Sequence, residues 1–129
     1  MKSLYASALV GLCLVATACG DSPAQLVVRG AGPHGCEYSG PNQISESVVE
    51  LAATPSGQGH ILAVIYELES EPADGEIDQS ELRSVVATVE NEDDVNLARR
   101  TAELSAGHYA IACKYGDFDG VVATLTVTP

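Results

Sequence analysis

Short apolar runs separated by turn-forming clusters constrain the fold of this chain more than any other feature. Clusters rich in Gly, Pro, Ser and Asp at 55–59 and 116–120 end or separate runs that are rich in Val, Ile, Leu and Ala. Several short strands with tight turns and even spacing are typical of an antiparallel β-sandwich. The sequence therefore predicts a mainly β fold, with strands over 25–29, 47–54, 61–68, 97–104, 108–115 and 121–127.

One segment departs from this pattern and predicts an inserted α-helix near residues 79–90. Asp78 followed by Glu81 forms a plausible N-terminal cap with an acidic first turn, which suits the helix dipole. Four β-branched residues lower the helix propensity of the segment. The helix prediction depends on apolar residues spaced at i, i+3, i+4 and i+7, which share one helix face: Leu82, Val85, Val86 and Val89.

The N-terminal residues form a pattern typical of export. Lys2 precedes an almost wholly apolar run over 4–15, and small residues at 16–18 precede Cys19. A membrane-spanning helix needs roughly 20 apolar residues, so this shorter run is typical of a signal peptide. The small residues before a cysteine resemble the lipobox of bacterial lipoproteins, although Ala16 stands where that family usually has Leu.

This resemblance implies that Cys19 is lipidated and becomes the first residue after cleavage. It divides the chain into a signal peptide over 1–18, a lipidated cysteine and tether over 19–24, and a domain over 25–129. Two acyl chains would anchor the protein firmly, because each buried CH₂ contributes about 0.8 kcal/mol. The expected location is the bacterial cell membrane or envelope, with the domain outside the cytoplasm. An ordinary secretory signal cut near Ala18 is the alternative.

Two cysteines, Cys36 and Cys113, remain in the expected domain. Outside the cytoplasm the default state of two such cysteines is a disulfide. The bridge would close a loop of about 77 residues, for which the chain-entropy model gives about 4.5 kcal/mol of stability. Two free thiols and two metal ligands are the alternative interpretations.

The C-terminal residues carry a more specific resemblance. Gly107, Tyr109 and Cys113 have the spacing G-x-Y-x-x-x-C, and an apolar closing strand follows at 120–127. This arrangement resembles the end of a cupredoxin-like domain, a Greek-key β-sandwich in which a hairpin brings a cysteine beside the final strand. The loop at 55–61 is similar to the one where that family places its first histidine ligand, here His60.

The resemblance does not extend to a complete copper site. A blue-copper centre needs two His, a Cys thiolate and usually an axial Met. Residues 114–119 contain no second His, and Val121 stands at the usual Met position. The chain is similar to the cupredoxin-like domains of iron-uptake-associated lipoproteins, several of which have a disulfide in place of copper. We therefore expect no cofactor.

An acidic segment offers a degenerate calcium loop. Eleven of the 18 acidic residues lie between residues 67 and 94, and the stretch 70–81 can be aligned with an EF-hand loop. Asp74, Asp78 and Glu81 match expected ligand positions. Ser70 and Pro72 stand at the first and third positions, where they weaken or remove ligands. A solvated acidic loop leading into the helix is the simpler interpretation.

No catalytic constellation appears in the sequence. Motifs for serine hydrolases, zinc proteases, P-loop enzymes and C-x-x-C redox proteins are absent, and the paired Asp117 and Asp119 fit a hairpin turn. The three histidines, His34, His60 and His108, share no ligand spacing. The formal net charge of −12 opposes binding to nucleic acid.

We expect a lipid-anchored, non-catalytic binding or accessory module with an unknown protein or small-molecule partner. A metal-binding protein, through the calcium loop or a remnant copper site, is the alternative.

Overall fold

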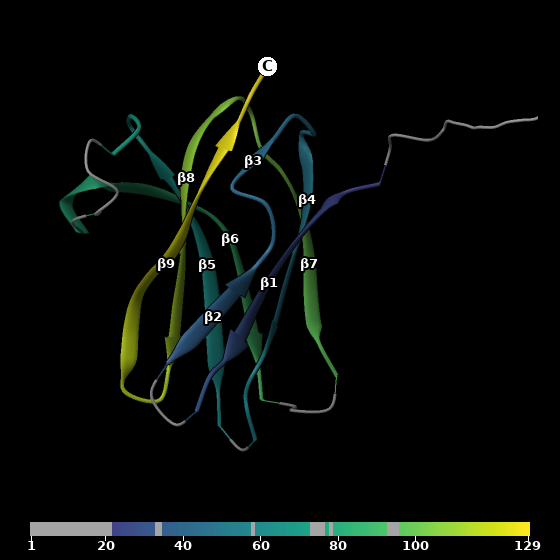
Figure 1. The fold of residues 1–129 in the computed structure, drawn as a ribbon, viewed down its shortest axis with the longest axis vertical. Helices are drawn as coiled ribbons and strands as arrows, with labels where there is room; N and C mark the ends of the chain where they lie inside the picture. Colours follow the sequence, from purple (N-terminus) through teal and green to yellow (C-terminus); the bar gives the residue numbers. More distant parts are fainter. Residues whose placement is uncertain (1–21, 33–34, 58, 73–76, 78, 93–95) are drawn as a thin grey trace, which may run out of the picture.

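The computed structural model describes residues 22–32, 35–57, 59–72, 77, 79–92 and 96–129. Over these residues the strands form two β-sheets, which Figure 1 shows as two layers. A hydrophobic core contains buried side chains from both sheets. The predicted mainly β, sandwich-like architecture is confirmed.

The first sheet has four strands in the order β2-β1-β4-β7. Its strands are β1 (Ala24–Gly30), β2 (Cys36–Ser39), β4 (Val48–Thr54) and β7 (Ala98–Glu103). The second sheet has five strands in the order β3-β9-β8-β5-β6. Its strands are β3 (Gln43–Ile44), β5 (Ile61–Leu68), β6 (Leu82–Asn91), β8 (Gly107–Tyr115) and β9 (Phe118–Val127).

Both sheets are mixed, which corrects the expectation of a purely antiparallel sandwich. β1 pairs in parallel with β4, and β3 pairs in parallel with β9. The reason lies in the path of the chain after β1. It turns back through β2, crosses to the second sheet for the two residues of β3, and returns to form β4 in the direction of β1.

The core follows from alternation along the strands. In β5, Ile61, Ala63 and Ile65 are fully buried, because successive side chains point to opposite faces and this set points between the sheets. The same alternation buries Leu26 and Val28 in β1. Similar inward-facing sets come from the other central strands: Val49, Leu51 and Ala53; Tyr109, Ile111, Cys113 and Tyr115; Leu125 and Val127.

The predicted helix near residues 79–90 is wrong. A single 3-10 turn, η1 (Gln79–Glu81), stands where the helix was expected to begin, and the edge strand β6 follows it. β6 pairs antiparallel with β5 through an irregular register, and Val85 and Val86 are exposed at 54% and 37%. The β-branched residues fit a strand better than a helix, and pairing with β5 decides the outcome. Asp78, the predicted cap, lies outside the described residues.

Asn91 links the two sheets where the chain leaves β6. Its side-chain amide donates to the carbonyl oxygen of Ala53 in β4 at 2.9 Å and to that of Asn96 at 2.8 Å. Asn91 is buried, so these bonds compensate for the loss of hydration of its amide. The amide therefore joins the edge of the second sheet to the centre of the first.

In the part of the chain that is described, no helix has the length and apolar character needed to cross a membrane.

Candidate functional site

The two cysteines predicted to pair form a disulfide. Cys36 in β2 and Cys113 in β8 are bonded, with their Cα atoms 6.4 Å apart and 77 residues of sequence between them. The bond joins the edge of the first sheet to the middle of the second. As predicted, Tyr109 and Ile111 share the buried face of β8 with Cys113, although the strand continues to Tyr115. A structural bridge replaces the free-thiol and metal-ligand interpretations.

The residues expected near a copper position are not brought together. Cys113 lies opposite Ala63 on the inner face of the second sheet, and its thiol is consumed by the disulfide. His60 precedes the buried Ile61 and is half exposed, and its Nε2 contacts the Glu90 carboxylate at 3.2 Å. Val121 lies opposite Ala112, one position along from the pair of Cys113 and Gly120.

The candidate calcium residues are only partly described. Glu81 ends η1, whereas Asp74 and Asp78 lie outside the described residues, as does Cys19. Among the residues whose placement is given, no three His, Cys, Asp or Glu side chains gather as a metal site. Glu81 does have an interaction of its own within the fold.

The other residues considered in the sequence, His108 and the paired Asp117 and Asp119, lie in or beside the hairpin of β8 and β9. The ring Nδ1 of His108 lies 3.2 Å from the Thr126 hydroxyl on the neighbouring strand β9. The turn predicted at 116–120 is tighter than expected, because Tyr115 pairs directly with Phe118 and leaves two residues in the hairpin loop. Gly116 has a φ of 61°, which glycine adopts without strain. Asp119 belongs to β9, while Asp117 is in the loop.

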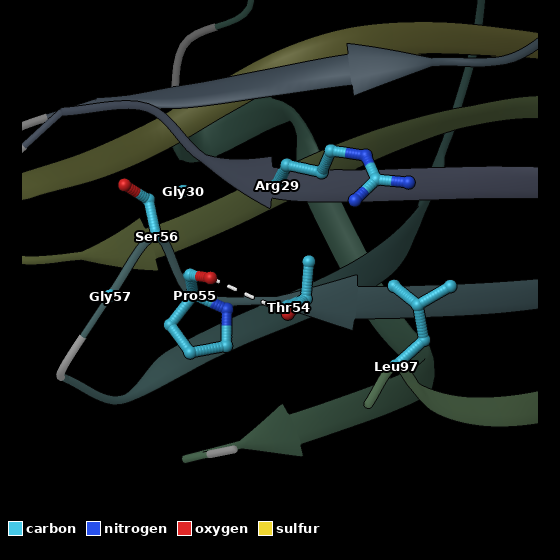
Figure 2. Close-up of a pocket in the computed structure, with 7 residues that line it drawn as sticks. All are labelled: Arg29, Gly30, Thr54, Pro55, Ser56, Gly57 and Leu97. Carbon is cyan, nitrogen blue, oxygen red and sulfur yellow. Dashed lines mark hydrogen bonds between the residues drawn. The ribbon is translucent and has the colours of Figure 1, made fainter. Parts of the chain in front are cut away.

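A cavity of about 320 Å³ lies at the end of the first sheet, where β1 and β4 finish and β7 begins. Figure 2 shows its lining, in which Arg29, Thr54 and Leu97 come from three neighbouring segments. The backbone of the loop after β4 supplies most of the remaining wall: Pro55, Ser56 and Gly57, with Gly30 at the end of β1. We call this space the end cavity.

The second sheet holds the wall of the end cavity in place. The Tyr115 hydroxyl donates to the Ser56 carbonyl oxygen at 2.6 Å and accepts from the Ser56 N–H at 3.2 Å. Gly30 makes room for this tyrosine, because a Cβ built on it would lie 2.7 Å from the Tyr115 ring. The loop after β4 is thus attached to both sheets rather than left to move alone.

The described lining of the end cavity combines a guanidinium with small polar and apolar groups. Arg29 is the one charged side chain among its lining residues, and no ion pair joins it to another residue in the described ranges. Thr54 uses its hydroxyl within the loop, donating to the Pro55 carbonyl oxygen at 3.4 Å (Figure 2). A guanidinium beside small polar groups suits a carboxylate or phosphate. Among the described residues of the lining, no nucleophile is paired with a base.

Sequence reasoning did not find the end cavity. The one available signal was the Pro- and Gly-rich cluster at 55–59, which predicted a turn but not its neighbours. Arg29 and Leu97 are separated by 68 positions and meet only because β1 and β7 flank β4.

No protein-family model, curated protein or solved structure matches this chain.

Proposed function

We propose that this protein is a lipid-anchored, extracytoplasmic, non-catalytic binding module built on a cupredoxin-like sandwich. The observation that carries the proposal is the Cys36–Cys113 disulfide. It ties the two sheets together and removes the thiolate that a copper centre would need. A domain that is cross-linked by a disulfide is suited to an oxidising compartment outside the cytoplasm.

The hairpin of β8 and β9 supports the cupredoxin-like part of the proposal. Cys113 lies opposite Gly120 in the last strand, as expected from a family in which a hairpin brings a cysteine beside the final strand. The Tyr109 hydroxyl donates to the Ser105 carbonyl oxygen at 2.7 Å, which secures the turn before β8. The G-x-Y-x-x-x-C residues thus act in the packing of the sandwich.

The anchor is tested by replacing the cysteine that would carry the lipid. Cys19→Ser should release the protein from membranes or leave it unprocessed, and should abolish labelling with radioactive palmitate. Cys13→Ser is the matched control, because Cys13 lies within the proposed signal peptide and should change neither result. A Cys19→Ser protein that fractionates and migrates like the wild type would overturn the anchored part of the proposal.

The binding function is tested at the end cavity. Arg29 should hold an acidic group, so NMR titration with acetate or inorganic phosphate should shift the signals of Ser56 and Gly57. Arg29→Gln should remove these shifts. Arg99→Gln is the control, because Arg99 lies on the same sheet but is paired with Glu50 at 3.1 Å. Equal loss in both variants would show a general charge effect rather than a site.

The metal-binding alternative has its own outcomes. Intense visible absorption on adding Cu(II) to the reduced protein would favour a remnant copper site at Cys113. A Ca²⁺-dependent rise in melting temperature that Glu81→Ala abolishes would favour the calcium loop. Glu103→Ala, on β7, provides a charge-matched control for the second test.

A further inference from the structure

A second cavity, of about 240 Å³, lies over the outer face of the second sheet. We call it the face cavity. Its floor comes from three neighbouring strands, with Tyr66 in β5, Ala112 in β8 and Val121 in β9. Ile77 and Leu82, from the connection between β5 and β6 and the start of β6, complete an apolar wall.

The register of the sheet explains why these residues share one surface. Ala112 pairs with Val64 on one side and with Val121 on the other, while Tyr66 pairs with Ala110. All of them alternate with inward-facing core residues, so their side chains point away from the core. The small side chain of Ala112 leaves space between Tyr66 and Val121, which larger residues at that position would fill.

Several polar side chains in the face cavity, those of Tyr66 and Asp119 among them, have no protein partner within the described ranges. No hydrogen bond joins the Tyr66 hydroxyl, and no ion pair or hydrogen bond joins the Asp119 carboxylate, to another described residue. Lys114 lies opposite Asp119 in the strand register, yet the two form no ion pair. Asp119 is exposed to solvent and Tyr66 is partly buried, so both groups are accessible to a ligand. A cavity that combines apolar side chains with accessible polar groups is a common form of a small-molecule site.

The charge of the site selects the class of ligand. Asp119 is the one charged residue among the described residues that line the face cavity, and the protein as a whole has a formal net charge of −12. The negative potential of such a surface attracts cations, and the ring of Tyr66 offers a face on which a cation is stabilised. Because Leu82, Ala112 and Val121 are apolar, a cation that fills the face cavity should also have an apolar part that packs against them.

We propose that the face cavity binds an organic ammonium ion with an apolar substituent. The ammonium group lies between the Asp119 carboxylate and the Tyr66 ring, and the substituent packs against Leu82, Ala112 and Val121. This inference gives the binding module proposed above a ligand class and relies on that proposal only for its biological setting. It does not depend on the end cavity or on the lipid.

The test uses the purified full chain in dodecyl maltoside, a detergent without an ammonium group. Benzyltrimethylammonium should bind in isothermal titration and shift the NMR signals of Ala112 and Val121. Benzyl alcohol, which is neutral, and benzoate, which is anionic, should bind at least about fivefold more weakly, as expected when roughly 1 kcal/mol comes from the charge. Equal binding of benzyl alcohol, or no binding of the cation at millimolar concentration, would overturn the proposal.

Variants of the face cavity separate a specific site from a diffuse charge effect. Asp119→Asn should weaken the binding of benzyltrimethylammonium about fivefold, whereas Asp117→Asn, in the adjacent loop, should leave it unchanged. Tyr66→Leu should weaken binding to a similar extent and Tyr66→Phe should restore it, because phenylalanine retains the ring. Ala112→Leu should fill the cavity and abolish binding. Equal effects of the two aspartate variants would contradict the site.

Folding of each variant is checked by near-ultraviolet circular dichroism and by the absence of a free thiol at Cys36 and Cys113 under denaturing conditions, determined by peptide mapping. If a variant keeps the disulfide and the native spectrum but no longer binds benzyltrimethylammonium, the loss of binding comes from the change in the cavity and not from unfolding. Failure of these titrations would leave the membrane-anchor and Arg29 experiments unaffected. The two proposals can therefore fail separately.

Discussion

The hydroxyl of Tyr115, at the end of β8, donates a hydrogen bond of 2.6 Å to the carbonyl oxygen of Ser56 in the loop after β4. The same hydroxyl accepts from the Ser56 N–H at 3.2 Å. One side chain from the second sheet therefore satisfies both backbone groups of a residue attached to the first. It closes the end of the sandwich and fixes the wall of the end cavity.

Replacing this hydroxyl should destabilise the fold without creating a large void. Tyr115→Phe leaves the ring in place but removes the partner of two backbone groups, so we expect a loss of about 1–3 kcal/mol. Urea unfolding followed by circular dichroism measures it. Tyr66→Phe is the control: its hydroxyl bonds to no described residue, and its effect should stay within about 0.5 kcal/mol. Similar values for both variants would contradict the role of Tyr115.

Gly30 should tolerate no side chain. A Cβ at this position would lie 2.7 Å from the Tyr115 ring and 2.9 Å from the Ser56 nitrogen, so the backbone or the ring must move. We expect Gly30→Ala to cost about 1–3 kcal/mol, as other overpacked sites do. At Gly120 the nearest heavy atom would be 3.6 Å away, at the Phe118 ring, so Gly120→Ala is the matched control. An unchanged urea midpoint in Gly30→Ala would show that the Tyr115 ring and the Ser56 backbone can shift to accommodate a Cβ without loss of stability.

The disulfide should contribute a large part of the stability. It spans 77 residues, and for a loop of that size the chain-entropy model gives about 4.5 kcal/mol. Cys36→Ser should therefore lower the free energy of unfolding by a few kcal/mol, measured by urea unfolding against the oxidised wild type. The mature protein, which by the proposal lacks Cys13 and has Cys19 lipidated, should show no thiol reactive with Ellman's reagent in denaturant. Two reactive thiols would reopen the copper hypothesis.

Tyr38 should make the fold sensitive to alkali. Burial raises the pKa of this tyrosine to about 12, above its ordinary value of 10.0. The folded state therefore holds the proton more tightly than the unfolded state. The associated stability is complete below pH 10 and is lost as the pH rises from about 10 to about 12. Tyr38 also donates to the Pro41 carbonyl oxygen at 2.6 Å, a bond that ionisation removes.

This prediction is measured by following phenolate absorption near 295 nm together with the urea midpoint across that pH range. In Tyr38→Phe the stability at neutral pH should fall, because the bond to Pro41 is lost, while the dependence on alkaline pH should become shallower. If Tyr38→Phe and wild type lose stability in parallel above pH 10, another group is responsible.

The sequence by itself determined the strands whose apolar patterns are long and bounded by turns. The interval predicted at 61–68 matches β5, and those at 47–54 and 108–115 differ from β4 and β8 by one residue. The pairing of Cys36 with Cys113 also followed from the sequence, because only these two cysteines remain once the predicted signal peptide and the predicted lipidation site are set aside. These predictions depend on local periodicity and on simple chemistry, which a linear chain displays directly.

The tertiary structure alone decided the rest. Residues 82–91 have apolar spacing that fits one helix face, yet they form a strand because β5 offers an edge for pairing and β-branched side chains fit it. β3 has two residues and exists only because β9 lies beside it. Both cavities join residues far apart in sequence through strand order. Strand order and register depend on the free energy of long-range contacts, and local sequence patterns do not encode which strands become neighbours.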